Sequence, residues 1–371
     1  MVLLIGNYPL ERQQSMLRFA TMMRDGLAAA GIKTEFIQPE PFFGNFQFAG
    51  HLVGKWLAYI DKFVLFPRQL KEALRTHPVL VHICDHSNAM YANRIRSAPV
   101  VVTCHDLLAV RGGLGEETDC PASPTGKILQ RWIVSGLRRA AAVACVSRTT
   151  CDDARRIVAG DPAKLKVITL GLSYPYQVIP ASEVRARLKT ISALHGPFVL
   201  HVGTNLRRKN REGILRIFAN CRERWNGQLV FAGERMSESL RALSRSLCIS
   251  DRVIEVVSPP NQLLEALYNG ATAFLFPSRF EGFGWPIIEA QACGCPVLTS
   301  AASPMAEVAG NGGMLRDSAD ENGFAEDLLS LIDPARRAEW SAKALQNAQR
   351  FTTDRMIAEY IELYRSLAPA C

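Results

Sequence analysis

The chain has 371 residues, more than one hydrophobic core usually holds, so two domains are expected. Hydrophobic residues make up 48% of it and charged residues 21%, which excludes an intrinsically disordered chain. The net charge is +8, and residues 1–172 hold 21 basic against 14 acidic side chains, or +7. This excess either attracts phosphates, anionic lipid or nucleic acid, or forms a solvated basic surface.

The N-terminal residues predict neither export nor a membrane anchor. The start, MVLLIGNYPLERQQ, lacks a basic n-region, a long apolar run and a small-residue cleavage site. No apolar run in the chain approaches the roughly 20 residues that span a bilayer. A cytoplasmic protein is therefore expected. Among the ten cysteines, Cys293 and Cys295 are one residue apart, which is not a CxxC spacing, so we expect structural thiols and no disulfides.

Short apolar runs alternate with helical patterns along the whole chain. In the first half, strands are expected at residues 2–6, 34–38, 79–84, 99–104, 141–147 and 166–170. In the second half, they are expected at residues 198–203, 228–233, 252–257, 272–277, 296–300 and 312–316. Runs rich in Val, Ile and Leu and separated by helices are typical of parallel strands buried on both faces. Two sets of six predict two doubly wound α/β domains.

The proline-containing segment 171–198 marks the expected boundary, which gives domains of residues 1–172 and 173–351. The terminal segment 352–371 has apolar residues at helical spacing, which predicts an amphipathic helix with one face to bury.

The segment 51–75 is amphipathic and has two interpretations. Its aromatic residues Trp56, Tyr59, Phe63 and Phe66 lie among Lys55, Lys62, Arg68 and Lys71. It either lies on an anionic bilayer and brings the protein to a lipid-linked acceptor, or packs on the sheet as a crossover helix. The flanking strands favour the crossover helix.

Two strand ends carry residues that suit a sugar nucleotide. The cations Arg207, Arg208 and Lys209 follow the strand that ends at Gly203, and they suit a diphosphate or form a solvated run. Glu281 precedes a Gly-Phe-Gly turn that leads into a helix, and amides at a helix start favour an anion. Glu289, within that helix, could accept two hydrogen bonds from a ribose diol. The alternative is two ordinary glutamates.

The segment Pro277–Val297, PSRFEGFGWPIIEAQACGCPV, resembles the E-x7-E signature of retaining glycosyltransferases of family 4. VGTNLRRKN (202–210) resembles the family's phosphate-binding loop, and VTCHDLLA (102–109) its N-terminal histidine motif. The resemblance is specific over residues 197–316, looser over 79–172 and weak before 79. It implies a GT-B architecture: two Rossmann-like domains facing across a cleft, with the C-terminal helix crossing back to the first. The first domain would bind the acceptor and the second the nucleotide-sugar donor.

The resemblance also implies roles for single residues. Glu289 would hold the ribose and Glu281 the donor sugar, while Lys209 and Arg208 would neutralise the leaving diphosphate. Further donor contacts would come from the phosphate loop and the glycine turn, namely Gly203, Thr204, Arg207, Gly282, Phe283, Gly284 and Trp285. His105 would lie near the reacting sugar, or it is a buried histidine bonded to a backbone carbonyl.

Two departures from the family pattern affect these assignments. The loop after the first strand has Gly6 alone in place of a Gly-Gly pair, so the acceptor-side contacts are assigned to other side chains. These are Asn7, Arg12, Gln13, Gln14 and Ser15, with Asp85 and His86 on the same edge. Thr204 stands where the family often has arginine, which leaves open whether Arg207 or Arg208 meets the diphosphate.

The predicted activity is retaining transfer of a sugar to a glycan or lipid-linked acceptor in cell-surface polysaccharide or glycolipid assembly. A UDP-sugar is the favoured donor, and GDP-mannose is the runner-up. No metal, cofactor or nucleic-acid partner is expected, and the cytoplasmic protein could contact the inner membrane face peripherally through its basic domain. The alternatives are a sugar-nucleotide 2-epimerase and a non-catalytic sugar-nucleotide-binding protein.

Overall fold

The computed structural model describes residues 1–11, 13–45, 56–158 and 160–368. The chain divides into two compact units. The first comprises Met1–Ser173 together with Thr353–Cys371, and the second comprises Tyr174–Thr352. This division falls within one residue of the domain boundary expected from the proline-containing segment. We call them the N-unit and the C-unit.

The N-unit contains a six-stranded, fully parallel sheet in the order β2-β1-β3-β4-β5-β6. Its strands are β1 (Val2–Ile5), β2 (Thr34–Ile37), β3 (Leu80–Ile83), β4 (Val100–Cys104), β5 (Ala142–Cys145) and β6 (Leu165–Val167). Its helices are α1 (Gln14–Ala29), α3 (Phe66–Ala73), α4 (Leu108–Gly113), α5 (Pro124–Arg139), α6 (Arg148–Val158) and α15 (Thr353–Leu367). The short helical turns are η1 (Pro9–Glu11), η3 (Asp61–Leu65), η4 (Leu74–Thr76), η5 (His86–Arg94) and η6 (Pro162–Lys164).

The C-unit contains a second parallel six-stranded sheet, in the order β12-β11-β10-β7-β8-β9. Its strands are β7 (Phe198–Gly203), β8 (Gln228–Gly233), β9 (Val253–Val257), β10 (Ala273–Phe276), β11 (Val297–Ser300) and β12 (Gly313–Arg316). Its helices are α7 (Ala181–Leu188), α8 (Arg211–Cys221), α9 (Glu238–Ser246), α10 (Asn261–Gly270), α11 (Trp285–Ala292), α12 (Met305–Ala309), α13 (Glu321–Ser330) and α14 (Pro334–Ala348). The short turns are η7 (Arg207–Lys209), η8 (Ser250–Arg252) and η9 (Gly310–Gly312).

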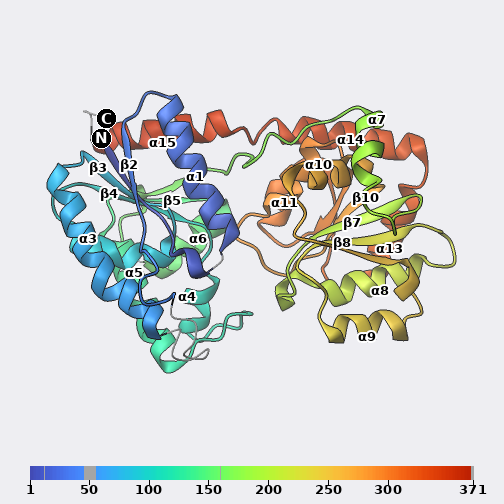
Figure 1. Ribbon diagram of the computed structural model, residues 1–371, viewed down its shortest axis with the longest axis horizontal. Helices are drawn as coiled ribbons and strands as arrows, with labels where there is room; N and C mark the ends of the chain where they lie inside the picture. Colours follow the sequence, from blue (N-terminus) through green and yellow to red (C-terminus); the bar gives the residue numbers. More distant parts are fainter. Residues whose placement is uncertain (12, 46–55, 159, 369–371) are drawn as a thin grey trace. The chain divides into compact units, whose positions relative to one another are not determined.

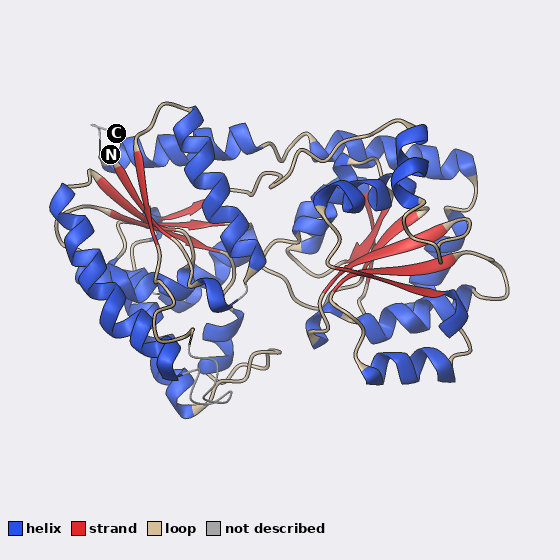
Figure 2. Ribbon diagram, viewed as in Figure 1, coloured by secondary structure: helices blue, strands red, loops and turns tan. Residues whose placement is uncertain are grey.

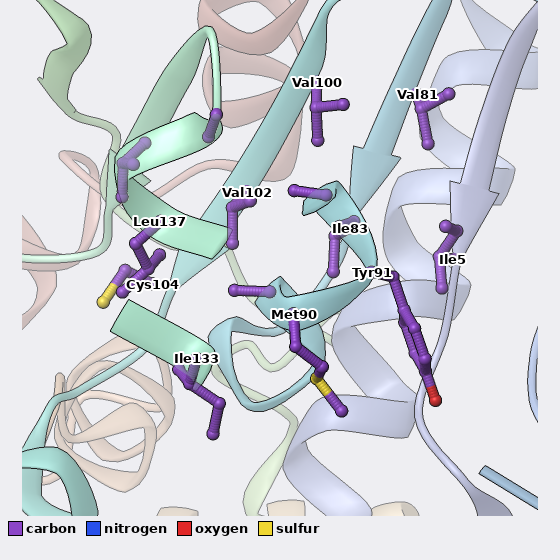
Figure 3. Close-up of a cluster of buried hydrophobic side chains, with 14 of the residues drawn as sticks. Ile5, Val81, Ile83, Met90, Tyr91, Val100, Val102, Cys104, Ile133 and Leu137 are labelled. Carbon is purple, nitrogen blue, oxygen red and sulfur yellow. The ribbon is translucent and has the colours of Figure 1, made fainter. Parts of the chain in front are cut away.

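Helices cover both faces of each sheet, which explains why the strands are apolar on both faces (Figure 2). All four residues of β1 and all five of β4 are buried. In the N-unit, one core lies between the sheet and the layer of η5 and α5, where Ile83, Val102, Met90 and Leu137 meet (Figure 3). Both sheets therefore confirm the predicted doubly wound α/β fold.

The helix α15, at the end of the chain, belongs to the N-unit and lies along α1 (Figure 1). Gly26 of α1 makes this close contact possible, because a Cβ there would come within 2.6 Å of the side chain of Ile357. The face of α15 predicted to be apolar is buried, including Met356, Tyr360 and Tyr364. The predicted return of the C-terminal helix to the first unit is therefore present.

Buried hydrogen bonds fix α15 to the sheet. His82 of β3 bonds through Nε2 to Thr103 Oγ1 at 2.8 Å and through Nδ1 to the Tyr364 hydroxyl at 2.7 Å. Thr103 Oγ1 in turn bonds to the Tyr360 hydroxyl at 2.7 Å. The four polar groups satisfy one another, which is the condition for burying them at low cost.

The amphipathic segment 51–75 lies partly outside the described residues, at 51–55. The rest forms one helical run: residues 56–60 are helical, η3 is a π-helical turn, and α3 follows. Phe66, Leu70 and Ala73 pack into the N-unit core, as the crossover-helix interpretation requires. Trp56 and Val64 remain exposed.

No helix among the described residues is long and apolar enough to cross a membrane. Cys84, Cys104 and Cys145 are free thiols, fully buried at the ends of strands, as expected for small apolar side chains.

Candidate active site

Each sheet has one topological switch point, and the predicted site residues lie at both. In the C-unit, the strand order reverses between β7 and β10, as in a dinucleotide-binding sheet. In the N-unit, it reverses between β1 and β3, as in a flavodoxin-like sheet. Connections leave a switch point in opposite directions, which opens a crevice at the carboxyl ends of the strands. Ligand-binding side chains are therefore expected directly after these four strands.

At the C-unit switch point, Glu281 pairs with two cations. Its Oε1 lies 2.5 Å from Nζ of Lys209, and its Oε2 lies 2.5 Å from Nη1 of Arg208. The side chains of Glu281, Lys209 and Arg208 are 7%, 11% and 22% exposed. The sequence places these residues 72 and 73 positions apart, and the β7–β10 pairing brings them together.

The charged groups in this cluster shift one another's pKa values. Burial alone raises the pKa of the Glu281 carboxyl, but Lys209 and Arg208 outweigh burial and lower this pKa below its usual value. Burial lowers the pKa of the Lys209 ammonium, and Glu281 only partly offsets this effect. One carboxylate and two cations sum to one positive charge, so the cluster is built to accept an anion.

A backbone carbonyl and an aromatic ring hold the two cations in place. Arg208 Nη1 also donates to the carbonyl oxygen of Phe280 at 3.1 Å, and Lys209 Nζ lies 5.0 Å from the centre of the Phe276 ring. The next residue, Asn210, has a left-handed backbone (φ 54°) and donates through Nδ2 to the carbonyl oxygen of Pro277. The turn η7 is thus tied to the segment after β10, which preorganises the cation pair.

Glu289 lies in α11 and is buried, with 3% of its surface exposed. Its Oε2 accepts a hydrogen bond from the hydroxyl of Tyr268 on α10, at 2.9 Å. Burial, followed by the charge of Glu289, raises the pKa of the Tyr268 hydroxyl well above its usual value. Tyr268 therefore stays protonated and fixes the orientation of the carboxylate.

The glycine turn between the two glutamates has the geometry that its sequence predicts. Gly284 precedes α11 with φ 100°, a conformation that an L-residue adopts only with strain. Pro286 occupies the first turn of the helix. Phe283 packs edge-on against Phe351, with ring centres 5.7 Å apart, and Trp285 is also buried.

At the N-unit switch point, Asn7 follows β1 and Asp85 follows β3. Asn7 Nδ2 donates to Asp85 Oδ2 at 2.5 Å and to Gln13 Oε1 at 2.8 Å. Ser87 donates to Asp85 through its amide and its hydroxyl, and His86 Nδ1 lies 3.0 Å from Asp85 Oδ1. The structure thus brings together four of the residues predicted on the acceptor side, namely Asn7, Gln13, Asp85 and His86.

The pKa values of His86 and Asp85 shift in opposite directions. Burial lowers the pKa of the His86 imidazole, but Asp85 outweighs burial and raises this pKa above its usual value. Burial alone raises the pKa of the Asp85 carboxyl, but His86 and its hydrogen bonds hold this pKa well below its usual range. The pair therefore favours a carboxylate beside a protonated ring.

His105 follows β4 on the same edge and is 5% exposed. Its Nε2 bonds to the carbonyl oxygen of Cys84 at 3.0 Å, and Phe19 packs edge-on against the ring at 4.8 Å. Burial lowers the pKa of the imidazole, which Asp85 and the carbonyl only partly restore. The backbone contact agrees with the alternative interpretation of a structural histidine and also fixes the ring at the strand end.

Other predicted residues lie apart from these clusters. Gln14 and Ser15, at the start of α1, are exposed, whereas Gln13, predicted with them, contacts Asn7. Arg12 lies outside the described residues. In the phosphate loop, Thr204 and Arg207 are exposed, whereas Arg208 is the arginine in the Glu281 cluster.

Three supporting residues were not predicted. Arg211 is buried and donates to the carbonyl oxygens of Gly203 and Glu234 at 2.7 and 2.8 Å, which fixes the phosphate loop to β8. Asn210 and Tyr268 support the cations and Glu289. A left-handed asparagine before a helix could have been suspected from TNLRRKNRE, but the Tyr268 contact joins two helices and leaves no local signal.

No group of three or more His, Cys, Asp or Glu side chains among the described residues is arranged to hold a metal ion. The two switch points offer different chemistry: a cation pair with two buried carboxylates in the C-unit, and a hydrogen-bonded polar cluster in the N-unit. The cation pair of the C-unit could neutralise an anionic ligand.

Comparison with known proteins identifies the family. A model described as "Glycosyltransferase Family 4" matches residues 17–174, and one described as "Glycosyl transferases group 1" matches residues 186–347. Between them, they cover most of both units. The chain therefore belongs to the glycosyltransferases of the family 4 type and has the GT-B fold, as the resemblance of its motifs implied.

Two individual relatives each share 29% sequence identity with the chain over the matched residues. The chain is 29% identical over 284 residues to a D-inositol 3-phosphate glycosyltransferase of Acidothermus cellulolyticus, covering 72% of this chain and 62% of that protein. It is 29% identical over 209 residues to O-antigen chain mannosyltransferase B of Escherichia coli, covering 54% and 55%. The chain thus spans less than two thirds of the length of either relative. The crystal structure of Anabaena HepE in complex with UDP-glucose has the same fold, with a TM-score of 0.73, 17% identity and 99% coverage of both chains.

Proposed function

We propose that this chain transfers a sugar, with retention of configuration, from a nucleotide-sugar donor to a glycan or lipid-linked acceptor. The observation that carries the proposal is the buried Glu281–Lys209–Arg208 cluster at the β7/β10 switch point. A UDP-sugar is the favoured donor, which the UDP-glucose complex of HepE supports. A mannosyl donor such as GDP-mannose is second, supported by the similarity to the O-antigen mannosyltransferase.

The C-unit cluster suits the charges that develop during this reaction. Breaking the anomeric C–O bond leaves a cationic sugar and sends the bonding electrons to the departing diphosphate. Lys209 and Arg208 would stabilise that diphosphate, while Glu289 would accept hydrogen bonds from the ribose. Oriented cations act most strongly where water is excluded, and these side chains are largely buried.

In a retaining reaction of this kind, the acceptor hydroxyl attacks from the face that the diphosphate leaves. A diphosphate oxygen takes the hydroxyl proton, so no carboxylate nucleophile of the glycosidase type is required. Glu281 would then position the donor sugar. His105 and the Asn7–Asp85–His86 cluster of the N-unit would hold the acceptor hydroxyl.

We further propose that the transfer is independent of metal ions, because two preorganised side-chain cations supply the charge needed by the leaving group. Activity in excess EDTA should equal activity without it. The site of action would be the cytoplasm, at the inner membrane face if the acceptor is lipid-linked.

A thermal-shift screen with UDP, GDP, ADP and their sugar conjugates is the first test. A ligand at 100 times its dissociation constant stabilises the folded protein by about 2.7 kcal/mol, a shift of several degrees. Stabilisation by one nucleotide series supports the proposal and names the donor. A protein that no nucleotide stabilises would refute it. Conversion of UDP-GlcNAc to UDP-ManNAc without an acceptor would indicate an epimerase instead.

A further inference from the structure

Five large apolar side chains are exposed on two helices of the N-unit. Trp56, Ile60 and Val64 recur every fourth residue along the helical run that leads into α3. Ile128 and Trp132, also four residues apart, lie on α5. Trp56 and Ile128 are 63% and 65% exposed, values unusual for such large apolar residues. We call this set the apolar face.

An unbroken chain of aromatic rings joins the two helices. The ring centres of Trp56 and Tyr59 are 5.7 Å apart, and those of Tyr59 and Phe63 are 5.5 Å apart. Phe63 then stacks on Trp132 of α5, with centres 5.6 Å apart and planes inclined by 30°. Figure 1 shows α3 and α5 in the same part of the N-unit. The two sets of exposed residues therefore belong to one surface.

Basic side chains accompany the apolar face. Lys127 and Arg131 each immediately precede an apolar member of the face on α5, and Arg68 and Lys71 continue the row beyond Val64. All four are exposed, and none forms an ion pair with a described carboxylate. Elsewhere in this unit, arginines such as Arg111 and Arg156 are paired with Glu116 and Asp153.

We propose that this surface binds an anionic lipid bilayer, with the five apolar side chains inserted among the headgroups and the four cations on lipid phosphates. This surface would bring the protein to a lipid-linked acceptor, and only this role of the surface rests on the proposed function. Tryptophan suits the headgroup region, because its ring is apolar and its N–H remains able to donate a hydrogen bond. Long basic side chains can reach lipid phosphates from the edge of an inserted surface.

Charge distinguishes a bilayer from a second copy of the chain. In a symmetric dimer through this surface, four unpaired cations would face four others, which like-charge repulsion disfavours. An anionic bilayer offers phosphates to all of them, and each Lys or Arg near such a surface strengthens binding. The unpaired cations therefore favour lipid over self-association.

The test is cosedimentation of the full chain with vesicles of phosphatidylcholine alone, or of phosphatidylcholine and phosphatidylglycerol in equal parts. We expect binding to the anionic vesicles, weak binding to the neutral ones, and loss of binding at high salt. Trp56→Ser/Ile128→Ser and Lys127→Glu/Arg131→Glu should each lower the partition constant at least about tenfold. The matched controls lie on the C-unit: Val178→Ser, which removes another exposed apolar residue, and Arg185→Glu/Lys189→Glu, on α7 and directly after it. Both should bind as wild type does.

Absence of binding to anionic vesicles, or equal binding by wild type and both face variants, would overturn the proposal. So would sedimentation of the wild type as a dimer that Trp56→Ser/Ile128→Ser dissociates. Unchanged melting temperatures show that the variants fold. The two experiments distinguish failure of this inference from failure of the proposed function. A protein that is stabilised by nucleotides but does not bind to vesicles contradicts the inference alone. Vesicle binding without nucleotide binding contradicts only the proposed function.

Discussion

Glu281 forms ion pairs with both Lys209 and Arg208, so its carboxylate competes for the cations that a diphosphate would need. Replacing it by the isosteric, neutral glutamine removes this competing anion while preserving the shape of the side chain. We expect Glu281→Gln to reduce turnover by about 100-fold or more, because an oriented charged group in a buried site is lost. The affinity for free nucleoside diphosphate should stay the same or increase.

Calorimetric titration with nucleoside diphosphate, together with steady-state kinetics, measures both effects. Glu212→Gln, an exposed glutamate on α8 of the same unit, serves as the control and should change neither quantity. Markedly weaker nucleotide binding by Glu281→Gln would mean that the carboxylate holds the cations in their binding geometry and does not compete with the ligand.

Glu289 should affect binding rather than turnover. Glu289→Ala removes a charged hydrogen-bond acceptor and should weaken nucleotide affinity by about 1–3 kcal/mol. Tyr268→Phe should act in the same direction by a smaller amount, because it frees the carboxylate that Tyr268 orients. Calorimetry measures the nucleotide affinity of both variants. Glu289→Gln keeps the shape of the side chain, so it separates the effect of the lost charge from an effect of misfolding. If all three variants bind nucleotide like wild type, the ribose assignment is wrong.

At the residue scale, the sequence indicated candidate residues of the C-unit but not their contacts. Glu281, Arg208 and Lys209 are recognisable because they follow strand ends, where parallel sheets bind ligands. Their mutual ion pairing depends on the adjacency of β7 and β10, which a single sequence does not reveal. Gln13 and Gln14 were both predicted near the acceptor, and the sequence did not choose between them: the contact of Gln13 with Asn7 depends on where α1 begins, and such boundaries are the least predictable feature.

At the scale of elements, the contact between α15 and the sheet depends on a neutral histidine. His82 bonds to Thr103 through one nitrogen and to Tyr364 through the other. A neutral ring can donate to one hydroxyl and accept from the other, whereas a protonated ring must donate at both. Burial, with a further contribution from His105, lowers the pKa of His82 to about 3.

This pKa shift makes the stability of the N-unit dependent on pH. The unfolded chain binds the proton with an ordinary pKa near 6.5, and the folded chain does not until about pH 3. Between these values the unfolded state holds more protons, so stability falls by up to about 1.4 kcal/mol for each unit of decreasing pH. His82→Gln removes this titration. Its destabilisation relative to wild type should be largest at neutral pH and shrink towards pH 4, as measured by denaturant unfolding. A pH-independent difference would contradict the assignment.

The elements themselves were largely predictable, because alternating apolar runs and helical patterns identify buried parallel strands. All twelve expected strands are present, although β6 ends at Val167, three residues before the predicted end. The π-helical turn η3 was not predicted. It arises where Asp61 is held by the Tyr8 hydroxyl and the amides of Phe43 and Gly44, which are distant contacts without a local sequence signal.

At the scale of the whole molecule, the two units should depend unequally on α15. Deleting Thr353–Cys371 removes the buried Tyr360 and Tyr364 and uncovers the side chains that they contact, including His82 of β3 and Phe19 of α1. We expect the N-unit to unfold at a much lower temperature, while the C-unit keeps its melting temperature and its nucleotide affinity. Calorimetric scanning with and without nucleotide resolves the two transitions. Loss of both together would show that the units fold as one.

The position of α15 also affects how the protein is made. The strands of the N-unit emerge first from the ribosome, but the helix that completes this unit follows 179 further residues, Tyr174–Thr352. At roughly 5–20 residues per second, that interval lasts about 10–40 s. During this time the C-unit can fold, while the N-unit presents an uncovered apolar surface to the solvent. We therefore expect the nascent N-unit, rather than the C-unit, to be the part that chaperones bind.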